Sequence, residues 1–333
     1  RQRQMCIRDS PMASAFVGGT AGLTPVQLPH DAMLLSERSE KNTDESGIGY
    51  FTPENVEYEK TLTLTPEDLG KVVYLECEGV YSNAVIEVNG AVAARHRFGF
   101  TGFVTKISDF LHAGDNKLKI TALNGLRPNG RYYTGTGIYR DVQLLMGDAL
   151  HIVPDGVRLK TLEADAKLAV IEVEATVRHE GLGHRKAEWS FRLLDRQGEE
   201  AASAHTVFNI FSGEQIVLRQ RLYVKKPLLW SCDQPDLYRW ESSITEGETV
   251  IDRAEGSFGV RKLTLDPIHG LRLNGESVKL KGGCIHSDNG MIGAVSLPDA
   301  EERRIRALRE AGYNAVRTAH NPVSVSYTHL TLP

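Results

Sequence analysis

Two groups of polar residues in the last fifth of the sequence carry side chains that could bind or act on a substrate. His286 and Asp288 follow the stretch "KLKGGCI", and Arg317, His320 and Asn321 follow "NAV". If both stretches are parallel strands, both groups lie at the carboxyl ends, where α/β proteins bind their ligands. Cationic, carboxylate and amide groups together suit the hydroxyl groups of a sugar. The alternative is that Arg317 forms a buried ion pair and that the histidines cap loops.

Other catalytic patterns are missing from the sequence. It contains no Gly-x-Ser-x-Gly, His-Glu-x-x-His or Cys-x-x-Cys motif. The stretch "GTGIYR" starts at Gly135 like a dinucleotide-binding fingerprint, but Arg140 stands at the third glycine and a strand is expected to follow, not a helix. Cys77, Cys232 and Cys284 are too scattered for a disulfide framework or a metal site. We therefore expect no cofactor, and a divalent or sodium ion in the intact protein stays open.

The two polar groups are separated by a segment with helical periodicity. In "SLPDAEERRIRALREAG", Pro298 suits the first helical turn and Gly312 suits the C-terminal cap. The sequence thus predicts strand, helix and strand, which is a βαβ unit with a parallel sheet. One face of this helix is apolar, and we expect it to be buried: Leu297, Ala300, Ile305, Leu308 and Ala311.

The spacing of Arg317 and His320 limits the length of the second strand. Residues three apart point to opposite faces of a regular strand. For both side chains to reach one site, the strand must end near Thr318. His320 is then expected on the loop before Pro322, whose ring disfavours helical geometry at the preceding residue.

The sequence from residue 57 to about 266 alternates apolar and polar residues over strand-length runs. Asn89-Gly90 in "VNGAV" predicts a tight hairpin. Strands at this spacing without long helices indicate antiparallel sandwiches. From residue 149 about seven strands fit an immunoglobulin-like fold without an internal disulfide. We expect "KKPLLWSCDQPDLYRW" to pack its aromatic residues on the edge of this sandwich.

The two ends of the sequence are related to each other through their codons. One codon choice for "RQRQMCIRD" has a reverse complement that encodes "VSYTHLTLP", the last nine residues. We therefore expect residues 1–10 and 325–333 to be translated sequencing adaptor, which is excluded from fold reasoning. The protein sequence between them is expected to be a fragment.

Charge and hydropathy exclude some classes of partner. The net charge is −4 and no Lys/Arg-rich run occurs outside the ends, so we expect neither nucleic acid nor an anionic membrane surface as a partner. No apolar run approaches the roughly 18 residues of a membrane-spanning helix. We favour a cytoplasmic protein, although its native N-terminus is expected to be missing. A homo-oligomer stays open.

Six stretches together resemble glycoside hydrolase family 2, which includes β-galactosidases, β-glucuronidases and β-mannosidases. In chain order they are "LPHD", "TGTGIYRDV", "PLLWSCDQPDLY", "FGVRKLTLD", "LRLNGESVKLKGGCIHSDNG" and "NAVRTAHNP". The resemblance implies a mostly β chain with a jelly-roll sugar-binding domain at 11–148 and an immunoglobulin-like sandwich at 149–264. It further implies the truncated start of a (β/α)₈ TIM barrel at 265–324.

The resemblance also implies roles for the candidate residues. His286 would lie near the sugar at the cleavage site, Arg317 beneath the catalytic carboxylates, and His320 on a sugar hydroxyl; Asp288 and Asn321 belong to the same substrate-binding set. Two departures are visible. Asn321 stands where many relatives have an aromatic residue, and "PNGRYYTGTG" lacks the acid that the best-known β-galactosidases use for sugar binding.

We therefore expect a fragment of a retaining β-glycosidase acting on an oligosaccharide or glycoside, with β-galactosidase-like specificity as the first choice. The family's acid/base and nucleophile glutamates are expected beyond the truncation, so no catalytic residue is assigned and the fragment is expected to be inactive. The alternatives are β-glucuronidase or β-mannosidase specificity, or a non-catalytic carbohydrate-binding or structural sandwich protein.

Overall fold

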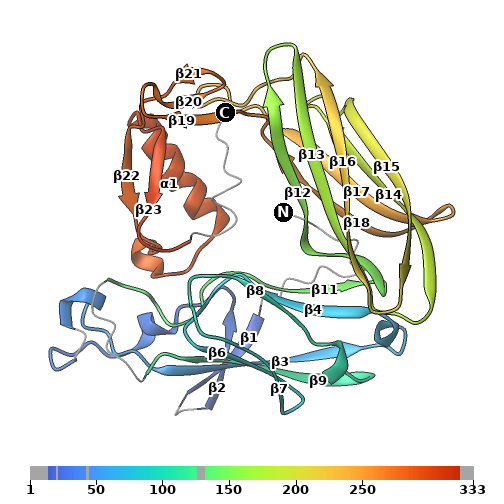
Figure 1. Ribbon diagram of the computed structural model, residues 1–333. Coiled ribbons are helices and arrows are strands. Elements are labelled where there is room, and N and C mark those ends of the chain that lie inside the picture. Colours follow the sequence, from blue (N-terminus) through green and yellow to red (C-terminus); the bar gives the residue numbers. More distant parts are fainter. Residues whose placement is uncertain (1–13, 20–21, 43–44, 126–131, 323–333) are drawn as a thin grey trace. The chain divides into compact units, whose positions relative to one another are not determined.

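The computed structural model describes residues 14–19, 22–42, 45–125 and 132–322 (Figure 1). The adaptor-like ends predicted at 1–10 and 325–333 lie outside these ranges. The described residues form two compact units. We call residues 146–281 the middle unit, and residues 14–145 with 282–322 the bipartite unit.

The first part of the bipartite unit is built from antiparallel strands. A six-stranded sheet has the order β2-β1-β3-β9-β6-β7, and a three-stranded sheet has the order β11-β4-β8, while β10 pairs with β5. Among the described residues, four short 3₁₀ helices lie between these strands: η1 (Ala32–Leu35), η2 (Glu45–Ile48), η3 (Asp68–Gly70) and η4 (Ser108–Phe110). The strands are β1 (Ser14–Gly19), β2 (Gly22–Gln27), β3 (Asn55–Leu64), β4 (Val72–Cys77), β5 (Val80–Tyr81), β6 (Ala84–Val88), β7 (Ala91–His96), β8 (Phe103–Lys106), β9 (Gly114–Leu123), β10 (Gly137–Ile138) and β11 (Val142–Gly147).

Sequence alternation determines which side of these strands faces the core. In β3, Val56, Tyr58, Leu62 and Leu64 are buried, and most of the residues between them are exposed. The predicted hairpin is confirmed, because Asn89-Gly90 connects β6 to β7 with both φ angles positive.

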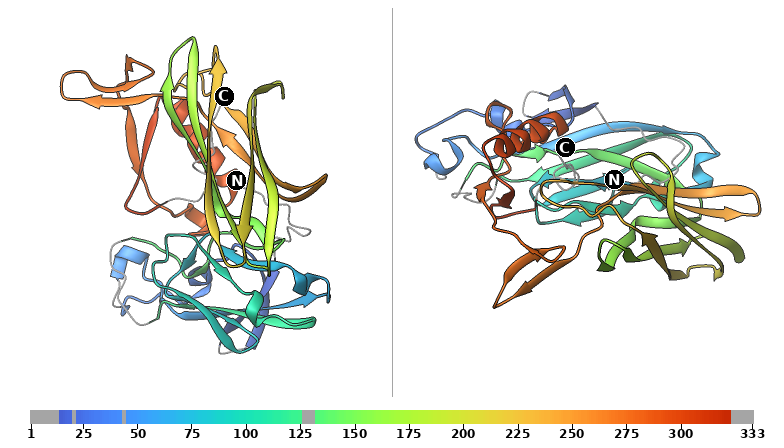
Figure 2. Two further views of the ribbon diagram at one scale, coloured as in Figure 1. Left: turned by 45° about the vertical axis from the view of Figure 1, so that its right-hand side comes forward. Right: turned by 90° about the horizontal axis from the view of Figure 1, so that it is seen from above.

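The middle unit contains the predicted sandwich of seven strands (Figures 1 and 2). One sheet has the order β12-β13-β16 and the other β15-β14-β17-β18. Both contribute to one buried core. The strands are β12 (Leu150–Ala164), β13 (Leu168–His179), β14 (His184–Leu194), β15 (Glu200–Phe211), β16 (Gln215–Lys225), β17 (Tyr238–Glu246) and β18 (Thr249–Phe258).

One of the two tryptophans in the predicted connection differs in position from the prediction. Trp230 does lie outside the strands, where the Arg261 guanidinium packs over its ring at 4.6 Å. Trp240, however, is buried on β17 and stacks on Phe191 with 5.9 Å between ring centroids. It is therefore a core residue and not an edge residue, because β17 begins at Tyr238 within the predicted connection.

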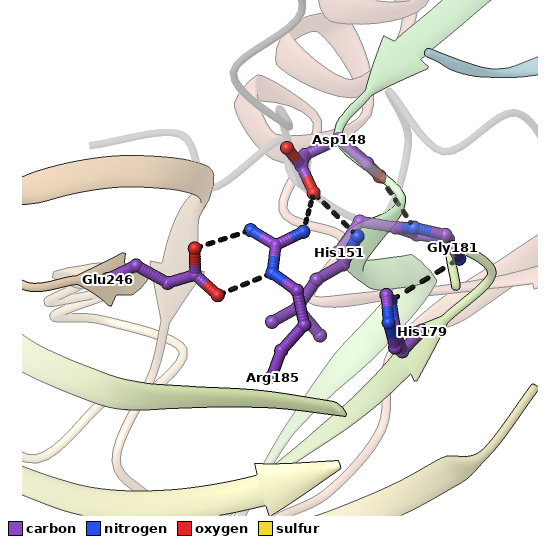
Figure 3. Close-up of polar contacts among 7 residues, drawn as sticks. Asp148, His151, His179, Gly181, Arg185 and Glu246 are labelled. Carbon is purple, nitrogen blue, oxygen red and sulfur yellow. Dashed lines mark hydrogen bonds and ion pairs between the residues drawn. The ribbon is translucent and has the colours of Figure 1, made fainter. Parts of the chain in front are cut away.

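A polar network closes one end of the middle unit (Figure 3). Arg185 on β14 donates two hydrogen bonds to the Glu246 carboxylate and one, of 2.7 Å, to Asp148. The Nδ1 atom of buried His151 lies 3.0 Å from the Asp148 carbonyl oxygen. Burial lowers the pKa of His151, with the Glu180 carboxylate opposing that shift. The network thus joins the starts of β12 and β14 to the end of β17.

A short ribbon follows the middle sandwich and belongs to the same compact unit. It consists of β19 (Leu263–Asp266), β20 (Gly270–Leu273) and β21 (Glu276–Ser277). Asn274 Nδ2 donates a hydrogen bond of 3.0 Å to the Trp230 carbonyl, which fixes the ribbon's turn. The compact units divide the chain after Lys281, whereas the predicted start of the third domain is residue 265.

The predicted βαβ unit is confirmed (Figure 1). Strands β22 (Gly282–Ile285) and β23 (Ala315–Thr318) pair in parallel, and η5 (Gly290–Ile292) and helix α1 (Pro298–Glu310) connect them. Pro298 is at the helix start, and Gly312 follows its end with φ +86°.

The expected burial of the apolar helix face is wrong for two of its five residues. Ala300, Ile305 and Leu308 are half-buried, but Leu297 is 40% exposed and Ala311 is also exposed. The one fully buried residue of α1 is Glu301. Within the described residues the parallel sheet beside α1 has two strands, and so small a sheet cannot cover the whole apolar face of the helix.

Candidate active site

The two polar groups singled out in the sequence lie at the same edge of the β22–β23 pair. Cys284 pairs with Arg317 and Ile285 with Thr318, so both strands end at one level. Strand β23 ends at Thr318, as predicted, and His320 lies on the loop that follows.

Three of the five candidate residues gather around a tyrosine that the sequence did not single out. The ring of Tyr132 lies 4.9 Å from that of His286 and 6.1 Å from that of His320, measured between centroids. The two histidine rings are 6.1 Å apart. Asn321 Nδ2 donates a hydrogen bond of 2.6 Å to Tyr132 Oη. Tyr132 is part of "RYYTGTG", which sequence reasoning considered only for its lack of an acid.

The other two candidate residues, Arg317 and Asp288, lie near other side chains. Arg317 is exposed, and its Nη1 lies 3.6 Å from Cys284 Sγ. It is therefore not the buried ion-pair residue of the alternative reading. Asp288 is half-buried, and its negative charge contributes to the raised pKa of Tyr133, whose main causes are burial and Asp31. Asp288 thus adds negative charge beside Tyr133.

Asp31 connects the loops around the candidate site through hydrogen bonds. In the sequence this residue is noted only as part of "LPHD". Its buried carboxylate accepts hydrogen bonds from the backbone N–H groups of Met33 (3.1 Å), Thr136 (2.9 Å) and Ala294 (2.9 Å). It also accepts one from Tyr133 Oη at 2.7 Å. One side chain therefore joins the loop after β2, the loop before β10 and the loop after β22.

Gly135 allows this close approach. Its φ is +70°, and a Cβ atom here would lie 2.6 Å from Ala294 Cβ and 2.8 Å from Asp31 Oδ2. Only glycine fits such a position without moving its neighbours. The stretch "GTGIYR" contains the two-residue strand β10 and is followed by strand β11 and not by a helix, in agreement with the rejection of a dinucleotide fingerprint.

Two arginines fix the loops that carry the histidines. Arg304 on α1 donates to the carbonyl oxygens of His286 (3.0 Å) and Asp288, and to Asn289 Oδ1. Buried Arg140 donates to the carbonyl of Pro322 at 2.9 Å. Burial lowers the pKa of the Arg140 guanidinium. The site loops are thus held by backbone contacts as well as by Asp31.

In the ranges that the structure describes, no group of three or more His, Cys, Asp and Glu side chains could hold a metal ion. None of the helices in those ranges is long and apolar enough to cross a membrane.

Two family models match the chain. The model "Glycosyl hydrolase 2 galactose-binding domain-like" matches residues 32–131, and "Glycosyl hydrolases family 2" matches residues 150–261. The chain is 32% identical over 298 residues to the β-galactosidase BoGH2A of Bacteroides ovatus, covering 89% of this chain and 35% of the relative. It is 29% identical over 309 residues to a β-glucuronidase of Bacteroides fragilis, covering 89% of this chain and 43% of the relative.

A solved structure shows the same fold. It is a glycosyl hydrolase family 2 member from Bacteroides cellulosilyticus, with a TM-score of 0.92 and 30% identity. The match covers 96% of this chain and 44% of that one. Both family models and the solved structure agree with the motifs of the sequence, and this chain belongs to glycosyl hydrolase family 2.

Proposed function

We propose that this chain is part of a retaining β-glycosidase that removes terminal β-linked sugars from oligosaccharides, with β-galactosides as the first substrates to test. The similarity to a β-galactosidase and a β-glucuronidase supports the class of reaction. The cluster of His286, His320 and Asn321 at the carboxyl ends of β22 and β23 supports the location of the sugar.

One observation carries the proposal furthest. The Nδ1 atom of His286 is buried and has no hydrogen-bond partner within the described residues. A buried polar atom without a partner costs free energy, and each such atom in a native structure calls for an explanation, which a bound ligand group can supply. A sugar hydroxyl can either donate to this nitrogen or accept from it, so it suits either tautomer of the ring.

The chemistry we propose uses two carboxylates from sequence that follows the barrel start. In retaining glycosidases these groups stand about 5–5.5 Å apart, one as acid/base and the other as nucleophile. Arg317 would favour the ionised form of the nucleophile through its charge. His320 would hydrogen-bond a ring hydroxyl, more strongly as positive charge develops on the sugar.

The rival proposal is a non-catalytic carbohydrate-binding protein. A binding sandwich has no need of a βαβ unit whose loops carry two histidines, and this favours the enzyme. Within the enzyme class, "RYYTGTG" contains no acidic residue, which favours testing β-glucuronides beside β-galactosides.

The test is hydrolysis of 4-nitrophenyl β-galactoside, β-glucuronide and β-mannoside by the enzyme expressed from the complete reading frame. We expect turnover of at least one substrate, and a product whose anomeric configuration is retained when followed by NMR. The 333-residue chain is expected to show none, because it is expected to lack both glutamates. Turnover by the purified 333-residue chain, inversion of configuration, or an inactive complete enzyme would each contradict the proposal.

A further inference from the structure

A row of aromatic rings leads from the histidine cluster along the sandwich of the bipartite unit. Tyr132, which contacts His286, lies 6.4 Å from Phe100 between ring centroids. Phe100 in turn lies 5.8 Å from Phe98. These separations are within the range of attractive aromatic pairs. We call Tyr132, Phe100 and Phe98 the aromatic row.

The members of the row differ in exposure. Phe98 is 49% exposed and Tyr132 is half-buried, whereas Phe100 between them is 5% exposed. Isolated exposed phenylalanines are common on proteins and need no explanation. Phe98 is different because it ends a continuous row that starts at the candidate site. Phe100 therefore supports two rings that can still meet a ligand.

The backbone beneath the row is fixed on several sides. Arg140 Nη1 donates to the Phe100 carbonyl at 3.1 Å, and Tyr139 Oη donates to the Gly99 carbonyl at 2.8 Å. A Cβ atom on Gly99 would lie 2.3 Å from Cδ2 of Tyr81, so this segment packs directly on the Tyr81 ring. A surface held in this way loses little conformational freedom when it binds a ligand.

We infer that Tyr132 and Phe98 form a binding surface for the sugar on the leaving-group side of the bond that is cleaved. This rests on the proposed function, in which His286 and His320 hold the terminal sugar. A pyranose ring presents several C–H groups on one face, and such groups pack on the electron-rich face of an aromatic ring. Asn321 fixes the Tyr132 hydroxyl and thereby the orientation of its ring. The surface selects substrates whose second unit is a sugar.

The experiment compares two substrates that share the terminal sugar. In a β-glycosyl fluoride the leaving group is one fluorine atom, which cannot reach the aromatic row, whereas a β-linked disaccharide carries a second ring. For the complete enzyme, we expect Phe98→Ala to lower the ratio of kcat/KM for the disaccharide to that for the fluoride by about five- to tenfold, the value of one aromatic contact. Phe98→Trp keeps a ring and should restore the ratio.

The matched control is Val92→Ala, which shortens a side chain of the same sandwich that is 45% exposed and outside the aromatic row. It should leave the ratio within twofold of wild type. A ratio unchanged in Phe98→Ala, with both substrates cleaved, overturns the inference while the proposed function stands. If wild type cleaves neither substrate, the proposed function fails and this inference fails with it.

Discussion

Replacing Asp31 with asparagine tests whether one buried carboxylate organises the candidate site. An asparagine carbonyl in place of Oδ1 can still accept from the Met33 and Thr136 N–H groups. Its amide group, in place of Oδ2, would face the Ala294 N–H, while the Tyr133 hydroxyl can turn and accept. One buried N–H thus loses its acceptor, which costs about 1–3 kcal/mol, and the remaining bonds lose the strength that the charge gives them. We expect the free energy of unfolding of the bipartite unit to fall by about 2–4 kcal/mol.

The chain offers a way to measure this in one unit at a time. All three tryptophans (Trp189, Trp230 and Trp240) lie in the middle unit, so their fluorescence follows that unit alone. Far-UV circular dichroism follows both units. In urea, Asp31→Asn should move a circular-dichroism transition to lower concentration by about 0.7 M or more, since m is about 1–3 kcal/mol per M. The fluorescence midpoint should stay unchanged.

The control for charge loss is Asp109→Asn, because the Asp109 side chain is 75% exposed and its nearest cation, Lys106, is 3.6 Å away. It should shift neither transition. If Asp31→Asn shifts circular dichroism by less than about 0.3 M, the four hydrogen bonds do not have the value assigned here. An equal shift of the fluorescence midpoint would also refute the reasoning.

Three further outcomes are expected. Burial lowers the pKa of His151 from about 6.5, so the folded middle unit favours the neutral ring, and the stability that this gives above pH 6.5 is lost as the pH falls toward the lowered pKa. His151→Gln should therefore make the fluorescence midpoint in urea depend less on pH. The same pH dependence in wild type and variant would contradict this. Arg185→Ala should lower the free energy of unfolding of the middle unit by about 1–3 kcal/mol, measured by urea unfolding. Arg185→Lys should recover only part of this loss, because lysine cannot form the paired hydrogen bonds to Glu246. Full recovery by lysine would show that the paired contact does not matter. In the complete enzyme, His320→Ala should lower kcat well beyond any rise in KM; a change in kcat/KM within about twofold, under about 0.5 kcal/mol, would make His320 only a loop cap.

The local patterns of the sequence predicted much of the fold. Alternation identified most strands of both sandwiches, Asn89-Gly90 gave its hairpin, and Pro298 with Gly312 bounded the helix. The three-residue spacing of Arg317 and His320 predicted where β23 ends. Each of these signals lies within a few residues of the feature that it predicts, so one sequence is enough to read it.

The residues that position the site could not be predicted from such local patterns. Asp31 accepts from backbone N–H groups, and a backbone N–H has no sequence signature. Tyr132 contacts residues more than 150 positions away, and nothing in "RYYTGTG" indicates which face of the ring is covered. The helix stripe was predicted as buried because periodicity shows which face is apolar, but not how much sheet is present to cover it.

The contacts of Asp31 and Arg140 also set an order for biosynthesis. Asp31 is separated from Ala294 by 263 positions, and Arg140 from Pro322 by 182. At about 5–20 residues per second, a ribosome needs about 10–50 s to deliver Ala294 after Asp31. Until those residues are synthesised, water must take the place of the Ala294 N–H on the Asp31 carboxylate and of the Pro322 carbonyl on the Arg140 guanidinium. The sandwich is therefore synthesised before the loops that carry the histidines, and those loops pack onto it afterwards. A substitution at Asp31 thus alters the surface that receives the loops before the histidines have been synthesised.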